Sequence, residues 1–229
     1  MSSHSGFLLE LLDGIRDNGL HSDLEVKCQS FSFKLHRCIV CPQSEFFHKA
    51  ITGSFIEAES HAITLHDDPL IVSKMFDYLY RADYNDVPAI LRERGQDQSE
   101  NFQEDEPNHQ ISSLQSPPAQ WSHARINVQI YIAADKYAID RLKTLAEHKL
   151  RCNMESGWDD LGMISLIELV YGPQCPPHSG IEAILLEFVM KHLKSLHNCL
   201  QFHAVLKDFP DLQDKLLHLT MRRVVDLEE

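Results

Sequence analysis

The stretch from His21 to Tyr84 reads HSDLEVKCQSFSFKLHRCIVCPQSEFFHKAITGSFIEAESHAITLHDDPLIVSKMFDYLYRADY and carries most of the information about the fold. Apolar and polar residues alternate in 24–28 and again in 31–35, which is the period of a strand with one buried face. Because only a short connection separates the two runs, together they predict a β-hairpin. A third short strand is expected around Ile63 and Leu65.

Two helices are expected in the same stretch. From Arg37 the apolar pattern becomes helical and continues to a stop at Gly53, which predicts one helix over 37–53. The sequence Asp67-Asp68-Pro69 marks the start of the next helix, because a carboxylate can accept from free amides and proline fits the first turn. The apolar stripe of this second helix is interpreted as core: Ile71, Met75, Phe76, Leu79 and Tyr80.

Outside this stretch the pattern is helical. Residues 7–17 place Leu8, Leu11, Leu12 and Ile15 on one helical face, and Asn18-Gly19 provides a stop. After residue 126 the helical period returns, with Asp140 as the expected cap of a second helix. Further helices are expected at 158–171, 179–195, 197–208 and 211–225.

Residues 86–122 differ in composition from the rest of the chain. They are polar, rich in acids and poor in branched apolar residues. Such a segment cannot bury enough surface to offset its ordering entropy, so we expect disorder there. A tolerated surface insertion is the favoured interpretation, and a short partner motif or phosphorylation site at Ser116-Pro117 is the alternative.

Charge and composition narrow the classes of partner. The chain of 229 residues is 43% hydrophobic and carries 34 acidic against 21 basic residues, a formal net charge of -13. That excess repels phosphate backbones, so direct nucleic-acid binding is not expected. No run approaches the about 20 apolar residues that span a bilayer, and no secretory signal is expected. The six cysteines are therefore expected to be reduced thiols in the cytoplasm, the nucleus or both.

The C-x-x-C of Cys38 and Cys41, flanked by His36 and His48, is the candidate for metal or redox chemistry. Structural zinc requires four convergent ligands, usually from two pairs, and the chain has no second C-x-x-C. Since the pair falls on the apolar face of an expected helix, buried structural thiols are favoured. Glycine is sparse, with nine residues, and neither a phosphate loop nor G-x-S-x-G occurs, so no cofactor and no catalytic residue are expected.

Asp23 and Arg37 are charged residues within apolar-patterned segments. Buried charges require partners, so the two side chains are expected either to pair across a shared pocket or to be solvated at the ends of their elements. The pattern alone leaves both interpretations open.

An ordered set of motifs resembles the BTB/POZ domain family in its fungal form with a single such domain. The residues that match are Ser22-Asp23-Leu24, Phe33-Lys34-Leu35-His36-Arg37, Ile39-Val40, Ser44 to Phe47, Gly53 to Ala58, Ile63 to Leu65, Tyr78 to Tyr84 and Ala133 to Tyr137. One departure is Gln29, which stands where a turn glycine is common in the family and weakens the expected hairpin geometry. The resemblance implies an α+β fold, a small sheet flanked by helices, followed here by an all-helical C-terminal extension.

The resemblance also implies domain boundaries and functions. It divides the chain into an N-terminal helix (1–20), a BTB/POZ core (21–87), an acidic insertion (88–123), closing helices (124–152) and a helical extension (153–229). It implies a protein-interaction module, not an enzyme, that acts as an adaptor or scaffold and homodimerises through Leu8, Leu11, Leu12 and Ile15. It further implies a charged pocket of Asp23 and Arg37, and a possible contact with the cullin-3 scaffold of a ubiquitin ligase through Phe55, Ile56 and Glu57.

Overall fold

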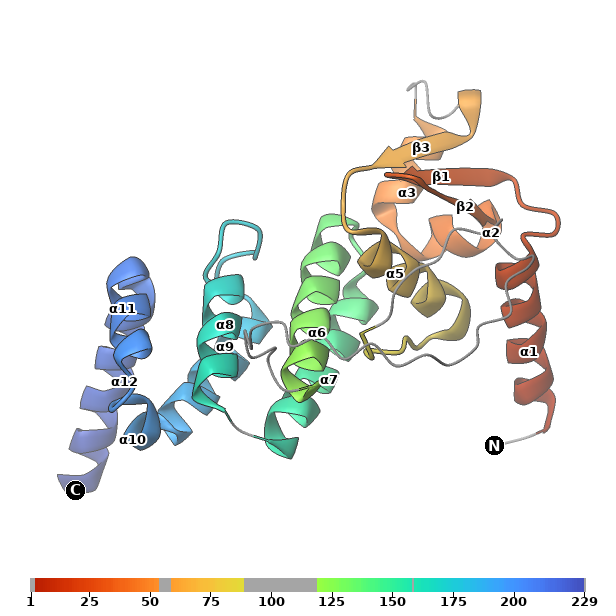
Figure 1. Cartoon of the computed structure of the whole chain (residues 1–229). Helices are drawn as coiled ribbons and strands as arrows, with labels where there is room; N and C mark the ends of the chain where they lie inside the picture. Colours follow the sequence, from red (N-terminus) through yellow and green to blue (C-terminus); the bar gives the residue numbers. More distant parts are fainter. Residues whose placement is uncertain (1–2, 54–58, 89–118, 158, 229) are drawn as a thin grey trace, which may run out of the picture.

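The computed structural model of the chain describes residues 3–53, 59–88, 119–157 and 159–228 (Figure 1). The expected cullin contact, Phe55 to Glu57, lies outside the described residues. So do most of the expected insertion and the Ser116-Pro117 motif. A small sheet flanked by helices is followed by helices only, which confirms the α+β class with an all-helical C-terminal region.

The sheet has the order β2-β1-β3. Strand β1 (Leu24–Cys28) pairs antiparallel with β2 (Phe31–Leu35) and parallel with β3 (Ala62–Leu65). In the register Val26 stands opposite both Phe33 and Ile63, and all three are buried, as the alternation predicts. The hairpin is confirmed, and Gln29 adopts a φ of 54° in its turn. This left-handed conformation costs a non-glycine residue about 1–2 kcal/mol, which the paired strands offset.

The prediction of a single helix over 37–53 is wrong. The chain forms α2 (Arg37–Val40), a 3₁₀ turn η1 (Cys41–Gln43) and α3 (Glu45–Thr52). Pro42 lacks the N–H that a continuous helix needs, and Ser44 is extended, with φ −138° and ψ 116°. The Ser44 hydroxyl accepts the backbone N–H of Phe47 at 3.2 Å, so the serine starts a new helix in place of continuing the old one.

Helix α5 (Pro69–Arg81) begins and ends as its sequence indicates. The Asp68 carboxylate accepts the N–H of Leu70 at 2.8 Å, and Pro69 occupies the first turn. Ala82 closes the helix with a φ of 56°. The predicted apolar stripe is buried throughout, from Ile71 to Tyr80.

Helices α6 (Ala119–Lys136) and α7 (Asp140–Ser156) pack against each other beside α5 (Figure 1). The expected cap by Asp140 is wrong: Ile139 occupies the cap position without a side-chain bond, and Asp140 lies inside the first turn. Asp67, just before α5, accepts from the Lys136 ammonium at 2.8 Å and from the Tyr137 hydroxyl. The end of α6 is thereby fastened to the end of the sheet.

The C-terminal region consists of α8 (Asp160–Val170), α9 (Gly180–Lys191), α10 (Leu193–Leu196), α11 (Leu200–Asp208) and α12 (Pro210–Glu228). The helix expected over 179–195 is interrupted at His192, and the other expected helices are confirmed within a few residues. Buried apolar side chains from this region and from the sheet and its helices form one core. Among the described residues, no helix is long and apolar enough to cross a membrane.

Candidate interaction site

Helix α1 (Ser3–Asn18) is the first element of the chain (Figure 1), and charged side chains fasten it to α5. Arg16 is buried, its guanidinium lies 5.8–6.0 Å from the rings of Phe33, Phe76 and Tyr80, and it reaches Asp77 at 3.4 Å. Burial raises the pKa of Asp77, and the neighbouring arginines oppose that shift. Near the helix end, Arg81 pairs with Asp13 and, at 3.6 Å, with Asp17. These contacts hold α1 in one orientation.

The N-terminal part of α1 exposes four large apolar side chains. Phe7 is 69% exposed, Leu8 55%, Leu9 45% and Leu11 49%. Leu12 is half-buried, and Ile15 packs against the core. Of the four residues expected at a dimer contact, the structure therefore places Leu8 and Leu11 on the surface and directs Ile15 inward. We call the exposed set, Phe7, Leu8, Leu9 and Leu11, the α1 face.

Asp23 and Arg37 are brought together, but not as an ion pair of their side chains. The Asp23 carboxylate accepts the backbone N–H of Arg37 at 2.8 Å, so it serves as a remote cap for α2. The Arg37 guanidinium instead points to His61, with 3.5 Å between the nitrogens. A shallow hollow beside them is lined by Asp23, Glu25, Lys34 and His61, and Arg37 is not part of its wall. The predicted pairing of side chains across a shared pocket is thus replaced by a side-chain to backbone bond.

His36 holds the connection between α1 and β1, a role that the sequence pattern did not reveal. Its Nε2 lies 2.7 Å from the Leu20 carbonyl, which can only accept, so Nε2 carries the proton. Its Nδ1 then accepts from the Tyr80 hydroxyl at 2.8 Å, and the same hydroxyl accepts the His36 backbone N–H at 2.9 Å. Burial raises the pKa of Tyr80 to about 12. No local sequence pattern marks this histidine as structural, because the role depends on Tyr80, which lies 44 positions away.

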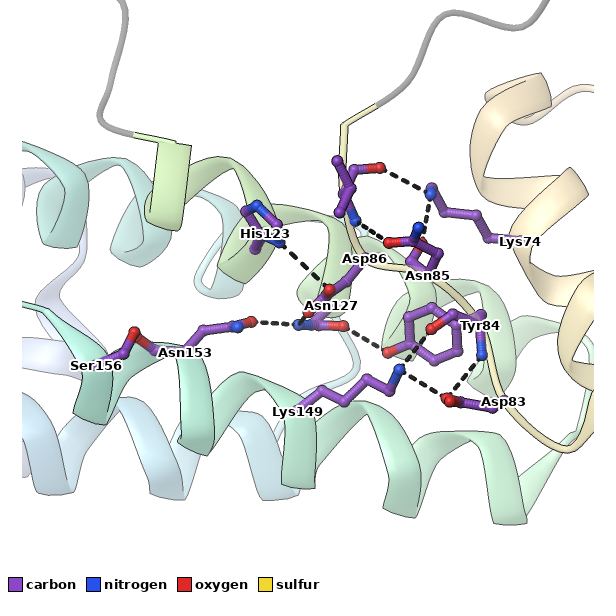
Figure 2. A network of polar contacts seen from close by, with 11 residues as sticks. Lys74, Asp83, Tyr84, Asn85, Asp86, His123, Asn127, Lys149, Asn153 and Ser156 are labelled. Carbon is purple, nitrogen blue, oxygen red and sulfur yellow. Dashed lines mark hydrogen bonds and ion pairs between the residues drawn. The ribbon is translucent and has the colours of Figure 1, made fainter.

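A polar network joins the segment after α5 to helices α6 and α7 (Figure 2). Asn127, fully buried, accepts from the Tyr84 hydroxyl at 2.5 Å and donates to Asp86 at 3.0 Å. His123 lies 3.3 Å from the other oxygen of Asp86. Burial by itself raises the pKa of Asp86, but the hydrogen bonds from Asn127 and His123 outweigh it, so the pKa lies below its ordinary value.

Two lysines complete the network around the same segment (Figure 2). Lys74 is buried and donates to the carbonyls of Asn85 and, at 2.9 Å, Val87. Its pKa is lowered by burial. Lys149 pairs with Asp83 at 2.7 Å and lies 4.3 Å from the centre of the Tyr84 ring. The network therefore anchors residues 83–87 from both sides.

Residues 12–94 match the family model described as the BTB/POZ domain. These residues form a BTB/POZ domain. No curated protein matches the chain. The matched range contains the end of α1, the sheet, α3 and α5. The fungal origin and the boundaries expected for the closing helices and the extension stay predictions.

Within this BTB domain the cysteine pair does not form the buried pair that its helical spacing predicted. Cys38 is exposed and Cys41 is half-buried, since the turn at Pro42 ends the shared helical face. Burial raises the pKa of the Cys41 thiol, which disfavours a nucleophilic thiolate. In the part of the chain that the structure describes, no group of three or more metal-binding side chains converges.

Proposed function

We propose that this chain is a non-enzymatic protein-interaction module that self-associates through the α1 face and acts as an adaptor or scaffold in the cytoplasm or nucleus. The BTB/POZ match supports the general class, since members of this family mediate protein contacts. The observation that carries the finer proposal is the contrast within α1. Its C-terminal part is fixed by contacts of Arg16, Asp13 and Asp17 with α5, while four large apolar side chains in its N-terminal part remain exposed.

Exposed apolar side chains make self-association favourable, because their contact with water costs free energy. On a helix such side chains favour association, because burial contributes about 25 cal/mol per Å² of apolar area. A rigid helix also loses little conformational entropy when it docks. In a twofold-symmetric pair the same patch serves both subunits, so one exposed face suffices.

The test is the oligomeric state of the full chain by sedimentation equilibrium at micromolar concentration. We expect a dimer for the wild type and a monomer for the double variant Leu8→Asp, Leu11→Asp. Leu200→Asp is the matched control, because Leu200 is 82% exposed and lies far along the chain on α11. A monomeric wild type, or a double variant that still dimerises, would show that the α1 face is not the contact.

A second candidate function is that of a substrate adaptor for a cullin-3 ubiquitin ligase. The hydrophobic-x-Glu motif Phe55-Ile56-Glu57 follows directly after α3, which ends at Thr52. Beside the start of α3, a groove of about 710 Å³ is lined by residues of α3, Tyr78 and the connection from α6 to α7. A partner helix could occupy such a groove.

The adaptor hypothesis is tested by recovery of purified cullin-3 on immobilised wild type and on the double variant Phe55→Ala, Glu57→Arg. We expect the variant to lose most of the recovery. Equal recovery by both proteins, or none by the wild type, removes the hypothesis without affecting the proposed self-association.

A further inference from the structure

Helices α9 and α12 are fastened side by side in the C-terminal region (Figure 1). Lys215 of α12 pairs with the buried Glu182 of α9 and with Asp211 one turn earlier. Further along, the Thr220 hydroxyl lies 3.9 Å from the sulfur of Met190. The two helices are thus fixed relative to each other at two levels.

A groove of about 620 Å³ lies along the same two helices, lined by residues of α9 and α12. Its apolar lining comes from Ala183, Leu186, Met190 and Leu219. Leu219 is 37% exposed, and Leu186 and Met190 are half-buried, so the lining is accessible from solvent. The size and the apolar lining suit two or three side chains of an incoming segment.

The charged residues of the groove are Glu187, Lys191 and Arg223. Glu187 is already neutralised by Arg151, whose nitrogen lies 2.8 Å from its carboxylate. Lys191 lies 5.5 Å from the centre of the Phe188 ring. None of the carboxylates whose side chains the structure describes lies within 4.0 Å of Lys191 or Arg223.

The chain carries a formal net charge of -13, but this groove presents two basic side chains to solvent. Some lysines elsewhere, such as Lys136 and Lys143, are instead each engaged by a carboxylate. The groove therefore combines an apolar lining with two cations that have not been neutralised. Its local charge is complementary to carboxylates.

We propose that the groove between α9 and α12 binds an acidic amphipathic segment of a partner protein. Apolar side chains of that segment fill the space over Leu186, Met190 and Leu219, and flanking carboxylates pair with Lys191 and Arg223. This site is separate from the α1 face, which lies at the other end of the chain (Figure 1). One molecule can then hold a partner while its BTB domain self-associates.

The helix itself provides matched controls. Leu217, Met221, Val224 and Val225 form a stripe on a different side of α12 and are exposed, but none of them lines the groove. Arg222 is the neighbour of Arg223 and also does not line it. Each groove substitution therefore has a counterpart of the same chemistry on the same helix.

The experiment is fluorescence anisotropy of the full chain with two labelled helical peptides. Both carry leucines at i, i+3, i+4 and i+7; one has glutamates and the other lysines at the flanking positions. We expect the acidic peptide to bind at least about tenfold more tightly than the basic one. We expect Arg223→Glu and Leu219→Asp each to weaken binding about tenfold or more, and Arg222→Glu and Leu217→Asp to change it by less than about twofold.

Arg223 is exposed, so the Arg223→Glu variant is expected to fold. It therefore tests the proposal even if Leu219→Asp perturbs the fold, which circular dichroism would report. No binding of the acidic peptide, preference for the basic one, or equal effects of Arg223→Glu and Arg222→Glu would overturn the proposal. So would a change of oligomeric state in Arg223→Glu by sedimentation, because it would identify a second copy of the chain as the occupant.

Discussion

The Nδ1 atom of His123 lies 3.3 Å from Oδ1 of Asp86, although the two residues are 37 positions apart in sequence. The contact joins the segment after α5 to the beginning of α6, on either side of residues 89–118 (Figure 2). Through Asn127 it continues to Tyr84. The network therefore couples the region that matches the BTB domain to helices that lie beyond the matched range.

The first prediction concerns the centre of this network. Asn127→Leu removes partners from the Tyr84 hydroxyl and the Asp86 carboxylate, both of which lie in a largely buried site. We expect a loss of about 2–4 kcal/mol in the free energy of unfolding, measured by urea denaturation. The control is Asn198→Leu, where the exposed amide donates to the carbonyl of Lys194 at 3.4 Å. Equal losses in the free energy of unfolding for the two variants would show that the network adds no stability beyond that of an exposed amide.

The second prediction concerns acid stability. Because hydrogen bonds lower the pKa of Asp86 in the folded state, the unfolded chain binds its proton first as the pH falls. The stabilisation by this carboxylate is therefore present above the ordinary aspartate pKa and is lost as the pH falls through the lower folded value. We expect Asp86→Asn to give a shallower fall of unfolding free energy between about pH 5 and pH 3 than the wild type. Asp214→Asn, at an exposed site on α12, should leave the slope unchanged, and the same slope in all three proteins would contradict the prediction.

The third prediction concerns alkaline stability. The pKa of Tyr80 is about 12 in the folded protein against an ordinary value of 10.0, so the unfolded chain releases this proton first as the pH rises. The contribution of the protonated Tyr80 to the free energy of unfolding is fully present below pH 10. It is lost as the pH rises through 12, and the total loss is about 2.7 kcal/mol. Tyr80→Phe should be less stable than the wild type by about 1–3 kcal/mol at pH 7, because His36 loses its partner. The difference should shrink between pH 10 and pH 12. A difference that stays constant over that range in urea titrations would refute the assignment.

The fourth prediction concerns the junction between α3 and α6. The Ser44 hydroxyl accepts the Phe47 N–H and donates to the Tyr137 carbonyl at 2.6 Å. Ser44→Ala removes a helix cap and leaves a buried carbonyl unsatisfied, so we expect a loss of about 2–3 kcal/mol. The measurement is thermal unfolding by circular dichroism. Ser60→Ala, at an exposed position, provides the reference and should shift the midpoint by no more than a degree or two.

Much of the fold followed from periodicity alone. The alternation over 24–28 and 31–35 predicted the hairpin, and the 3.6-residue stripe from Ile71 to Tyr80 predicted a buried helix, because burial on one face imposes these periods directly. The helix over 37–53 was wrong because the apolar pattern continues across Pro42 and Ser44, where the backbone turns. The same turn separates Cys38 from the environment of Cys41.

Contacts between distant residues could not be read from any local pattern. Asp23 does contact Arg37, but the bond uses the backbone N–H in place of the expected side-chain pairing, and every non-proline residue carries such a group. The role of His36 likewise depends on Tyr80, 44 positions away.

The sequence by itself determined the class of fold, the apolar stripe of residues 7–17 and the acidic charge, because these depend on residue type and period. The tertiary structure decided which leucines remain uncovered, which cations lack a carboxylate and how Asp86 meets His123. Those outcomes depend on which surfaces other helices cover and on which charges they bring into range, and only the packed chain fixes both.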